Sequence, residues 1–111
     1  MTKIFEPLFD GFTDTADIAR QFETDIGDID VIVAVYWYGS YEGDAIVVYK
    51  QDGEYYEAHG SHCSCYGLEG QWGGEPIVLK ELLNRPSYVG YSDNSQINEA
   101  IRAKLREYFL P

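Results

Sequence analysis

The chain has 111 residues, a formal net charge of −11, 45% apolar residues and 24% charged residues. This length suits one domain over residues 1–111 whose core needs neither disulfides nor metal, and the composition excludes a disordered chain. The strong negative charge repels phosphate backbones and therefore argues against direct binding of DNA or RNA.

No targeting or membrane segment is expected. The first residues contain no apolar stretch as long as that of a signal peptide, and the longest apolar run, Val31–Tyr38, is too short to span a bilayer. Two cysteines one residue apart do not make a secreted disulfide framework. We therefore expect a cytoplasmic protein with reduced thiols and no membrane partner.

The first predicted elements are a helix and a strand. Asp14 is a good N-cap, and Ile18, Phe22 and Ile26 recur every four residues, which predicts an amphipathic helix over residues 14–26. The β-branched and aromatic residues 31–38 predict a central strand that is covered on both faces.

Two further strands are predicted at residues 45–50 and 54–59. The Asp52-Gly53 dipeptide between them favours a tight hairpin turn. These two strands therefore form an antiparallel hairpin, and the central strand lies beside it as a meander.

The remainder predicts a loop and two helices. Glycines at 67, 70, 73 and 74 favour an irregular loop, in which Leu68 and Trp72 close a gap between the sheet and the next helix. That helix starts at Pro76 and ends near Asn84, and a last helix begins near Ser95. The fold class is thus α+β, with a three- to four-stranded antiparallel sheet and about three flanking helices.

One loop gathers most of the residues that could carry special chemistry. The candidate loop site, within residues 59–72, consists of His59, His62, Cys63, Cys65, Glu69 and Trp72. Zinc prefers nitrogen and sulfur donors, but structural zinc sites take ligands from two separated segments. If residues 61–65 are extended, Cys63 and Cys65 face one way and His62 the other, which disfavours one shared metal ion.

A cysteine nucleophile is a further alternative for this loop. It needs a histidine within hydrogen-bond reach, and His59 reaches Cys63 only if the chain bends at Gly60. Burial of the thiols in a structural role is the favoured interpretation. The sequence therefore assigns no catalytic residue, metal ligand or cofactor, and it favours a protein that is not an enzyme.

The segment GSHCSCYGLEGQW, residues 60–72, resembles a block found in small, mostly uncharacterised proteins encoded by bacteriophages and prophages. The resemblance extends over about residues 43–83, and Gly73-Gly74 departs from the more acidic continuation of that group. No established activity accompanies the resemblance, so it transfers no catalytic residue. It implies a virus-encoded accessory protein in the host bacterial cytoplasm.

The acidic residues suggest how such a protein acts. Residues 1–30 and residues 31–75 each carry a net charge of −6, whereas residues 76–111 carry +1. A surface of carboxylates can occupy a basic groove on a host protein and mask its nucleic-acid-binding surface. The candidate interaction residues are Asp14, Asp17, Glu23, Asp25, Asp28, Asp30, Asp52, Glu54 and Glu57.

Overall fold

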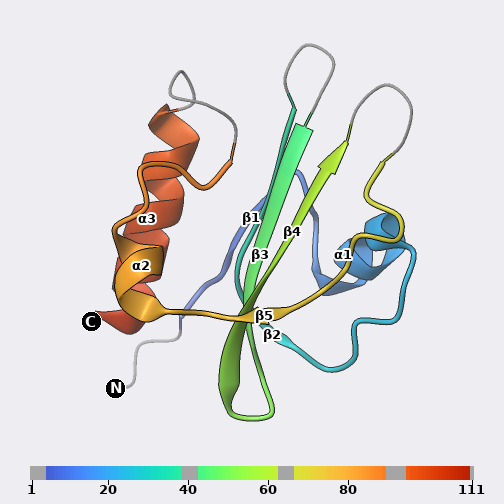
Figure 1. Ribbon diagram of the computed structural model, residues 1–111, viewed down its shortest axis with the longest axis horizontal. Helices are drawn as coiled ribbons and strands as arrows, with labels where there is room; N and C mark the ends of the chain where they lie inside the picture. Colours follow the sequence, from blue (N-terminus) through green and yellow to red (C-terminus); the bar gives the residue numbers. More distant parts are fainter. Residues whose placement is uncertain (1–4, 39–42, 63–66, 90–94, 111) are drawn as a thin grey trace.

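The computed structural model describes residues 5–38, 43–62, 67–89 and 95–110. Figure 1 shows a sheet with helices on both of its faces. The elements in chain order are β1 (Leu8–Asp10), α1 (Thr15–Phe22), β2 (Asp30–Tyr38), β3 (Gly43–Gln51), β4 (Glu54–His62), β5 (Glu75–Pro76), α2 (Leu79–Leu83) and α3 (Ser95–Phe109).

Among the described residues, the sheet contains five strands in the order β1-β2-β3-β4-β5 and is mixed. The predicted meander of β2, β3 and β4 is confirmed, because each of these neighbours pairs antiparallel. The predicted antiparallel sheet of three to four strands is confirmed for its central strands and is incomplete at both edges, where one of the two added strands is parallel. There β1 pairs parallel to β2, and the two-residue β5 pairs with β4. Strands of two or three residues are too short to give a readable alternation of apolar and polar residues.

The first helix ends earlier than residue 26, the end that the sequence predicts. Asp14 caps its start, since the side-chain carboxylate accepts the backbone N–H of Asp17 at 2.8 Å. Glu23 adopts the left-handed conformation with φ of 53°, and its N–H donates to the carbonyl oxygen of Arg20. This conformation ends α1 at Phe22 because it turns the chain out of the helix. Ile26 lies beyond this end but is still buried in one core with Ile18 and Phe22 of α1.

The central strands are buried on both faces, as their apolar composition predicts. In β3, Val47 and Tyr49 face the core under α1, whereas Ile46 and Val48 face the core under α2 and α3. A bulge at Ile32 shifts the register of β2 against β3, so two successive side chains of β2 face α2 and α3. The two cores therefore lie on opposite faces of the sheet, as the arrangement of helices in Figure 1 shows.

Two predictions for residues 67–84 are corrected. Leu68 and Trp72 pack into the core under α1 and not between the sheet and the helix that follows Ile77. That helix begins at Leu79, because Pro76 belongs to β5 and the Ile77 N–H donates to the Tyr55 carbonyl oxygen at 3.3 Å. The chain thus completes the sheet before it turns into α2.

We expect Val78→Ser to stabilise the fold. Val78 is the N-cap residue of α2, is already extended, and makes no side-chain capping hydrogen bond. A serine hydroxyl there can accept a free N–H of the first helical turn, which is expected to raise the free energy of unfolding by about 0.5–1 kcal/mol. Urea unfolding measures this change, with Val78→Ala, which cannot cap, as the control. Equal free energies of unfolding for the two variants would contradict the capping argument.

Candidate functional site

The structure does not bring the predicted loop residues together. His59 and His62 lie on β4, three residues apart, so their side chains point to opposite faces of the sheet. His62 contacts Tyr36 on the face of α1, whereas His59 contacts Glu57 on the face of α2. Cys63 and Cys65 lie outside the described residues. The described histidines therefore occupy two separate environments.

His62 packs against Tyr36 and Gly43. Its Nδ1 lies 2.7 Å from the hydroxyl oxygen of the buried Tyr36, and the two rings meet edge to face. Gly43 lies opposite His62 in the β3–β4 register, and a Cβ atom at this glycine would lie 2.5 Å from the imidazole Cε1. The imidazole ring therefore occupies the space above Gly43, where any other residue would collide with it.

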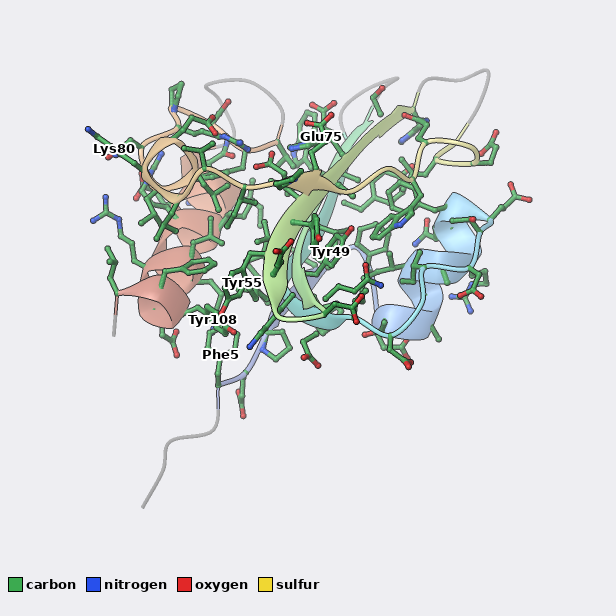
Figure 2. All side chains as sticks on the ribbon, turned by 60° about the horizontal axis from the view of Figure 1, so that its bottom comes forward. Phe5, Tyr49, Tyr55, Glu75, Lys80 and Tyr108 are labelled. Carbon is green, nitrogen blue, oxygen red and sulfur yellow. The ribbon has the colours of Figure 1, made fainter. Side chains whose placement is uncertain are left out.

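Glu69 and Trp72 also serve the fold. The Trp72 ring stacks on Tyr49 at a centroid distance of 5.3 Å and meets the edge of Phe22 at 5.1 Å. Figure 2 labels Tyr49 in the region between the sheet and α1. Both carboxylate oxygens of Glu69 accept the backbone N–H of Gly67. Packing and turn formation account for these two residues.

Gln71 holds the loop against β4 and was not singled out from the sequence. Its side-chain oxygen accepts the Ser61 N–H at 2.9 Å, and its side-chain nitrogen donates to the Ser61 carbonyl oxygen at 2.6 Å. The same nitrogen donates to the Gly67 carbonyl oxygen at 2.7 Å. The side-chain amide thus takes the place of a neighbouring strand's peptide group, and no local sequence pattern marks that role.

A charged network on the other face of β4 surrounds Glu57. His59 Nε2 hydrogen-bonds to one oxygen of Glu57, and Arg85 Nη2 donates to the other at 2.7 Å. Arg85 also donates to both oxygens of Glu81, at 2.6 and 2.8 Å. Burial by itself raises the pKa of Glu57, but the hydrogen bonds from Arg85 and His59 outweigh it and hold this pKa below its ordinary value.

An open cavity of about 430 Å³ lies beside this network. It is lined by Asp44, His59, Ser61, Gln71 and Tyr88, among others. The side chain of His59 is 46% exposed and hydrogen-bonds to the buried carboxylate of Glu57. The buried carboxylate thus orients an accessible imidazole at the wall of a polar cavity.

Two of the nine predicted interaction residues lie beneath the surface. Asp17 is 4% exposed and accepts the Thr13 N–H at 2.9 Å, and Arg20 and Gln21 also donate to it. Glu57 is 6% exposed within the network described above. Both are corrected from surface to structural residues, because their buried carboxylates are held by hydrogen bonds from neighbouring side chains and, for Asp17, from the Thr13 N–H. Glu23 is exposed at the end of α1.

The other six carboxylates lie at one end of the sheet. The loop between α1 and β2 meets the β3–β4 turn, where Gln51 Nε2 donates to the Ile26 carbonyl oxygen at 3.4 Å. Asp14 and Asp30 line one cavity of about 450 Å³ at the start of β2. All six are exposed, and we call them the acidic surface: Asp14, Asp25, Asp28, Asp30, Asp52 and Glu54.

Most described bases are already paired with other acids. Arg20 pairs with Asp17, Arg85 with Glu57 and Glu81, Arg102 with Glu99, and Lys104 with Glu107. Within the part of the chain that the structure describes, the acidic surface makes no ion pair. None of its six carboxylates therefore has a described base within ion-pair distance, and the nearest base in the sheet register is Lys50, which lies opposite Asp30.

Among residues 5–38, 43–62, 67–89 and 95–110, no three His, Cys, Asp or Glu side chains are grouped in a way that could hold a metal ion. No helix in these ranges has both the length and the apolar character that crossing a membrane requires.

Comparison with known proteins finds no matching family model, no matching curated protein and no matching solved structure.

We expect Arg85→Met to lower stability strongly. The substitution keeps an unbranched apolar stem but leaves the buried Glu57 without its guanidinium partner, which is expected to lower the free energy of unfolding by about 3 kcal/mol at pH 7. Chemical denaturation at several pH values measures this loss. The double variant Arg85→Met/Glu57→Gln removes the buried charge and is expected to recover most of it.

The pH dependence follows from the pKa of Glu57. In the native protein this pKa lies below the ordinary value of 4.5, so its stabilising effect is present above that value and disappears as the pH falls through the folded-state pKa. Without Arg85, the pKa of Glu57 loses the larger of the two hydrogen-bonding effects that lower it, while burial still raises it. Protonation of Glu57 is therefore expected to reduce the loss of stability as the pH falls. If Arg85→Met and Arg85→Met/Glu57→Gln lost the same free energy of unfolding at every pH, a role for the Glu57 charge would be contradicted.

Proposed function

We propose that this protein acts by stoichiometric binding, with its acidic surface seated on a basic surface of a partner protein. The observation that carries the proposal is the concentration of six exposed carboxylates at one end of the sheet, while most described bases are paired elsewhere. Complementary charge accelerates association and selects partners of opposite sign.

The partner class follows from the same charge. Basic grooves that hold nucleic acid have the sign and the density of charge that the acidic surface complements. Its occupation of such a groove would exclude DNA or RNA. The resemblance of residues 60–72 to bacteriophage and prophage proteins supports a host bacterial protein as the target. We therefore propose a virus-encoded accessory protein that masks a nucleic-acid-binding surface of its host.

We expect the variant Asp28→Asn/Asp30→Asn/Asp52→Asn to lose most of this binding. Asp52 has φ of 53°, a conformation that asparagine also adopts, so the turn is retained while its charge is removed. A basic partner captured from bacterial lysate by the native protein is expected to bind the variant about tenfold more weakly. Its affinity for the native protein is also expected to fall as salt is raised.

The matched control removes the same charge elsewhere. Glu69→Gln/Glu75→Gln/Glu99→Gln lowers the negative charge equally but leaves the acidic surface intact. We expect it to retain the same partner in pull-downs read by mass spectrometry. Equal loss of binding in both triple variants would show that net charge alone matters and would overturn the proposed surface.

A second candidate function is small-ligand binding at the cavity beside His59. The oriented, half-exposed imidazole at its wall is the specific observation in favour. A ligand held there stabilises the folded state by mass action. In a thermal-shift screen of small polar metabolites, we expect a ligand to raise the melting temperature of the native protein but not that of His59→Asn. Equal shifts in both proteins would place the ligand elsewhere.

A further inference from the structure

The outer edge of β4 is covered in two places, with one outward-facing residue between them. At one place β5 pairs with Tyr56 and Glu57. At the other, the side-chain amide of Gln71 bonds to both backbone groups of Ser61. Figure 1 shows β4 extending past the short β5. The residue between these two covers is His59, which also lines the cavity of about 430 Å³.

The backbone N–H and C=O of His59 point to this outer edge. Along a strand, these groups point to the same side at every second residue. Ser61 directs both of its groups outward to Gln71, and the Tyr55 carbonyl oxygen accepts the Ile77 N–H from the same side. His59 shares this alternation. In the described part of the chain, the pairing with β5 ends at residue 57 and no loop backbone bonds to His59.

The segment before β5 does not continue along this edge. Trp72 stacks on Tyr49, which faces the core under α1. A Cβ atom at Gly74 would collide with the Tyr49 hydroxyl, so the chain passes close over the same face. Residues 72–74 thus cross the sheet on the side of α1. The opening at His59 is therefore a consequence of how Trp72 packs.

We propose that this opening binds the primary carboxamide group of a small ligand. Gln71 shows the geometry, because its carboxamide meets the Ser61 N–H at 2.9 Å and the Ser61 carbonyl oxygen at 2.6 Å. A second carboxamide beside His59, two residues along the strand, meets the same pair of groups. The inference rests on the second candidate function, since it names the chemical class of ligand for the cavity beside His59.

The cavity wall favours a carboxamide over a carboxylate of the same shape. Asp44 lies opposite Ser61 in the β3–β4 register and lines the cavity together with His59. A carboxylate would bring a second negative charge near Asp44 and would place an oxygen against the His59 carbonyl oxygen. A carboxamide presents an N–H to that carbonyl oxygen instead.

The imidazole of His59 adds a further hydrogen-bonding group. The pKa of Glu57 lies below its ordinary value, so this carboxylate is ionised at pH 7 and only accepts hydrogen bonds. The proton of the neutral imidazole therefore lies on Nε2, which bonds to Glu57, and Nδ1 is the remaining acceptor. The second N–H of a carboxamide supplies a donor for such an acceptor.

Two neutral compounds with the same ring test the proposal. Nicotinamide carries a primary carboxamide, whereas methyl nicotinate carries an ester without an N–H. An NMR titration of the isotope-labelled full chain follows the backbone amide signals. We expect nicotinamide to bind about tenfold more tightly than the ester, with the largest shift at the His59 amide. Equal affinities, or shifts centred away from residues 59–61, would overturn the inference.

Two variants separate the backbone contact from the side-chain contact. His59→Thr and His59→Pro both lose the imidazole, but only proline also lacks the N–H. Proline is tolerated where that N–H faces outward from a strand edge. We expect both to bind nicotinamide more weakly, with its preference over the ester kept in His59→Thr and lost in His59→Pro. A preference kept in a folded His59→Pro would overturn the backbone contact, and the native titration decides if this variant does not fold.

Failure of the ligand class is distinct from failure of the second candidate function. If other small polar metabolites stabilise the native protein through His59 and nicotinamide does not bind, the carboxamide class is overturned and the candidate function stands. If neither binds, both are overturned. The tripeptide Ala-Gln-Ala, acetylated and N-methylamidated at its ends, tests a protein side chain as the source of the carboxamide. Tighter binding of this peptide than of nicotinamide would overturn the small-ligand source.

Discussion

The structure depends on one constraint, the burial of β2 and β3 on both faces. These strands carry apolar side chains at nearly every position, so each face of the sheet must be covered. The helix α1 covers one face, and α2 with α3 covers the other. The charged side chains of β2 and β3 consequently lie near the ends of these strands. The acidic surface lies at one end, and the network of Glu57, His59 and Arg85 lies on β4.

The two charged regions differ in how their charge is balanced. Glu57 is buried, and both of its oxygens are satisfied by Arg85 and His59, so that the network joins β4 to the segment after α2. Removing one partner from such a pair leaves a costly buried charge. The carboxylates of the acidic surface remain in water, where isolated charges cost little stability. The first arrangement serves the fold, and the second is free to serve an interaction.

The sequence predicted the elements whose own residues carry a clear pattern of apolar positions or a turn motif. The apolar run from Val31, the Asp52-Gly53 turn and the spacing of Ile18 and Phe22 each gave a correct element. The end of α1 was missed, because the left-handed Glu23 has no strong sequence signal. The edge strands were missed because their pairing depends on the neighbouring strands and not on their own residues.

The candidate site was less predictable, because its contacts also join segments that are distant in the sequence. The sequence groups His59 and His62 in one candidate loop, whereas β4 extends through both and turns them to opposite faces of the sheet. The pairing of Glu57 with Arg85 joins residues 28 positions apart, which no local pattern predicts. Burial of Asp17 likewise depends on donors from Thr13 and Gln21, which sequence spacing alone does not require. The sequence predicts that the chain is acidic. It does not predict that the α1–β2 loop and the β3–β4 turn lie side by side, which the hydrogen bond from Gln51 to the Ile26 carbonyl oxygen shows.

The tight β3–β4 turn has a consequence for the order of folding. Asp52 and Gly53 both have positive φ, and the two strands pair without a register shift from Gln51–Glu54 to Gly43–His62. Contacts between residues close in sequence form with little loss of chain entropy, so we expect this hairpin early in folding. The parallel β1–β2 pair must wait for the crossover that contains α1. The N-terminal strand is therefore expected to dock last, onto a sheet that the hairpin has already organised.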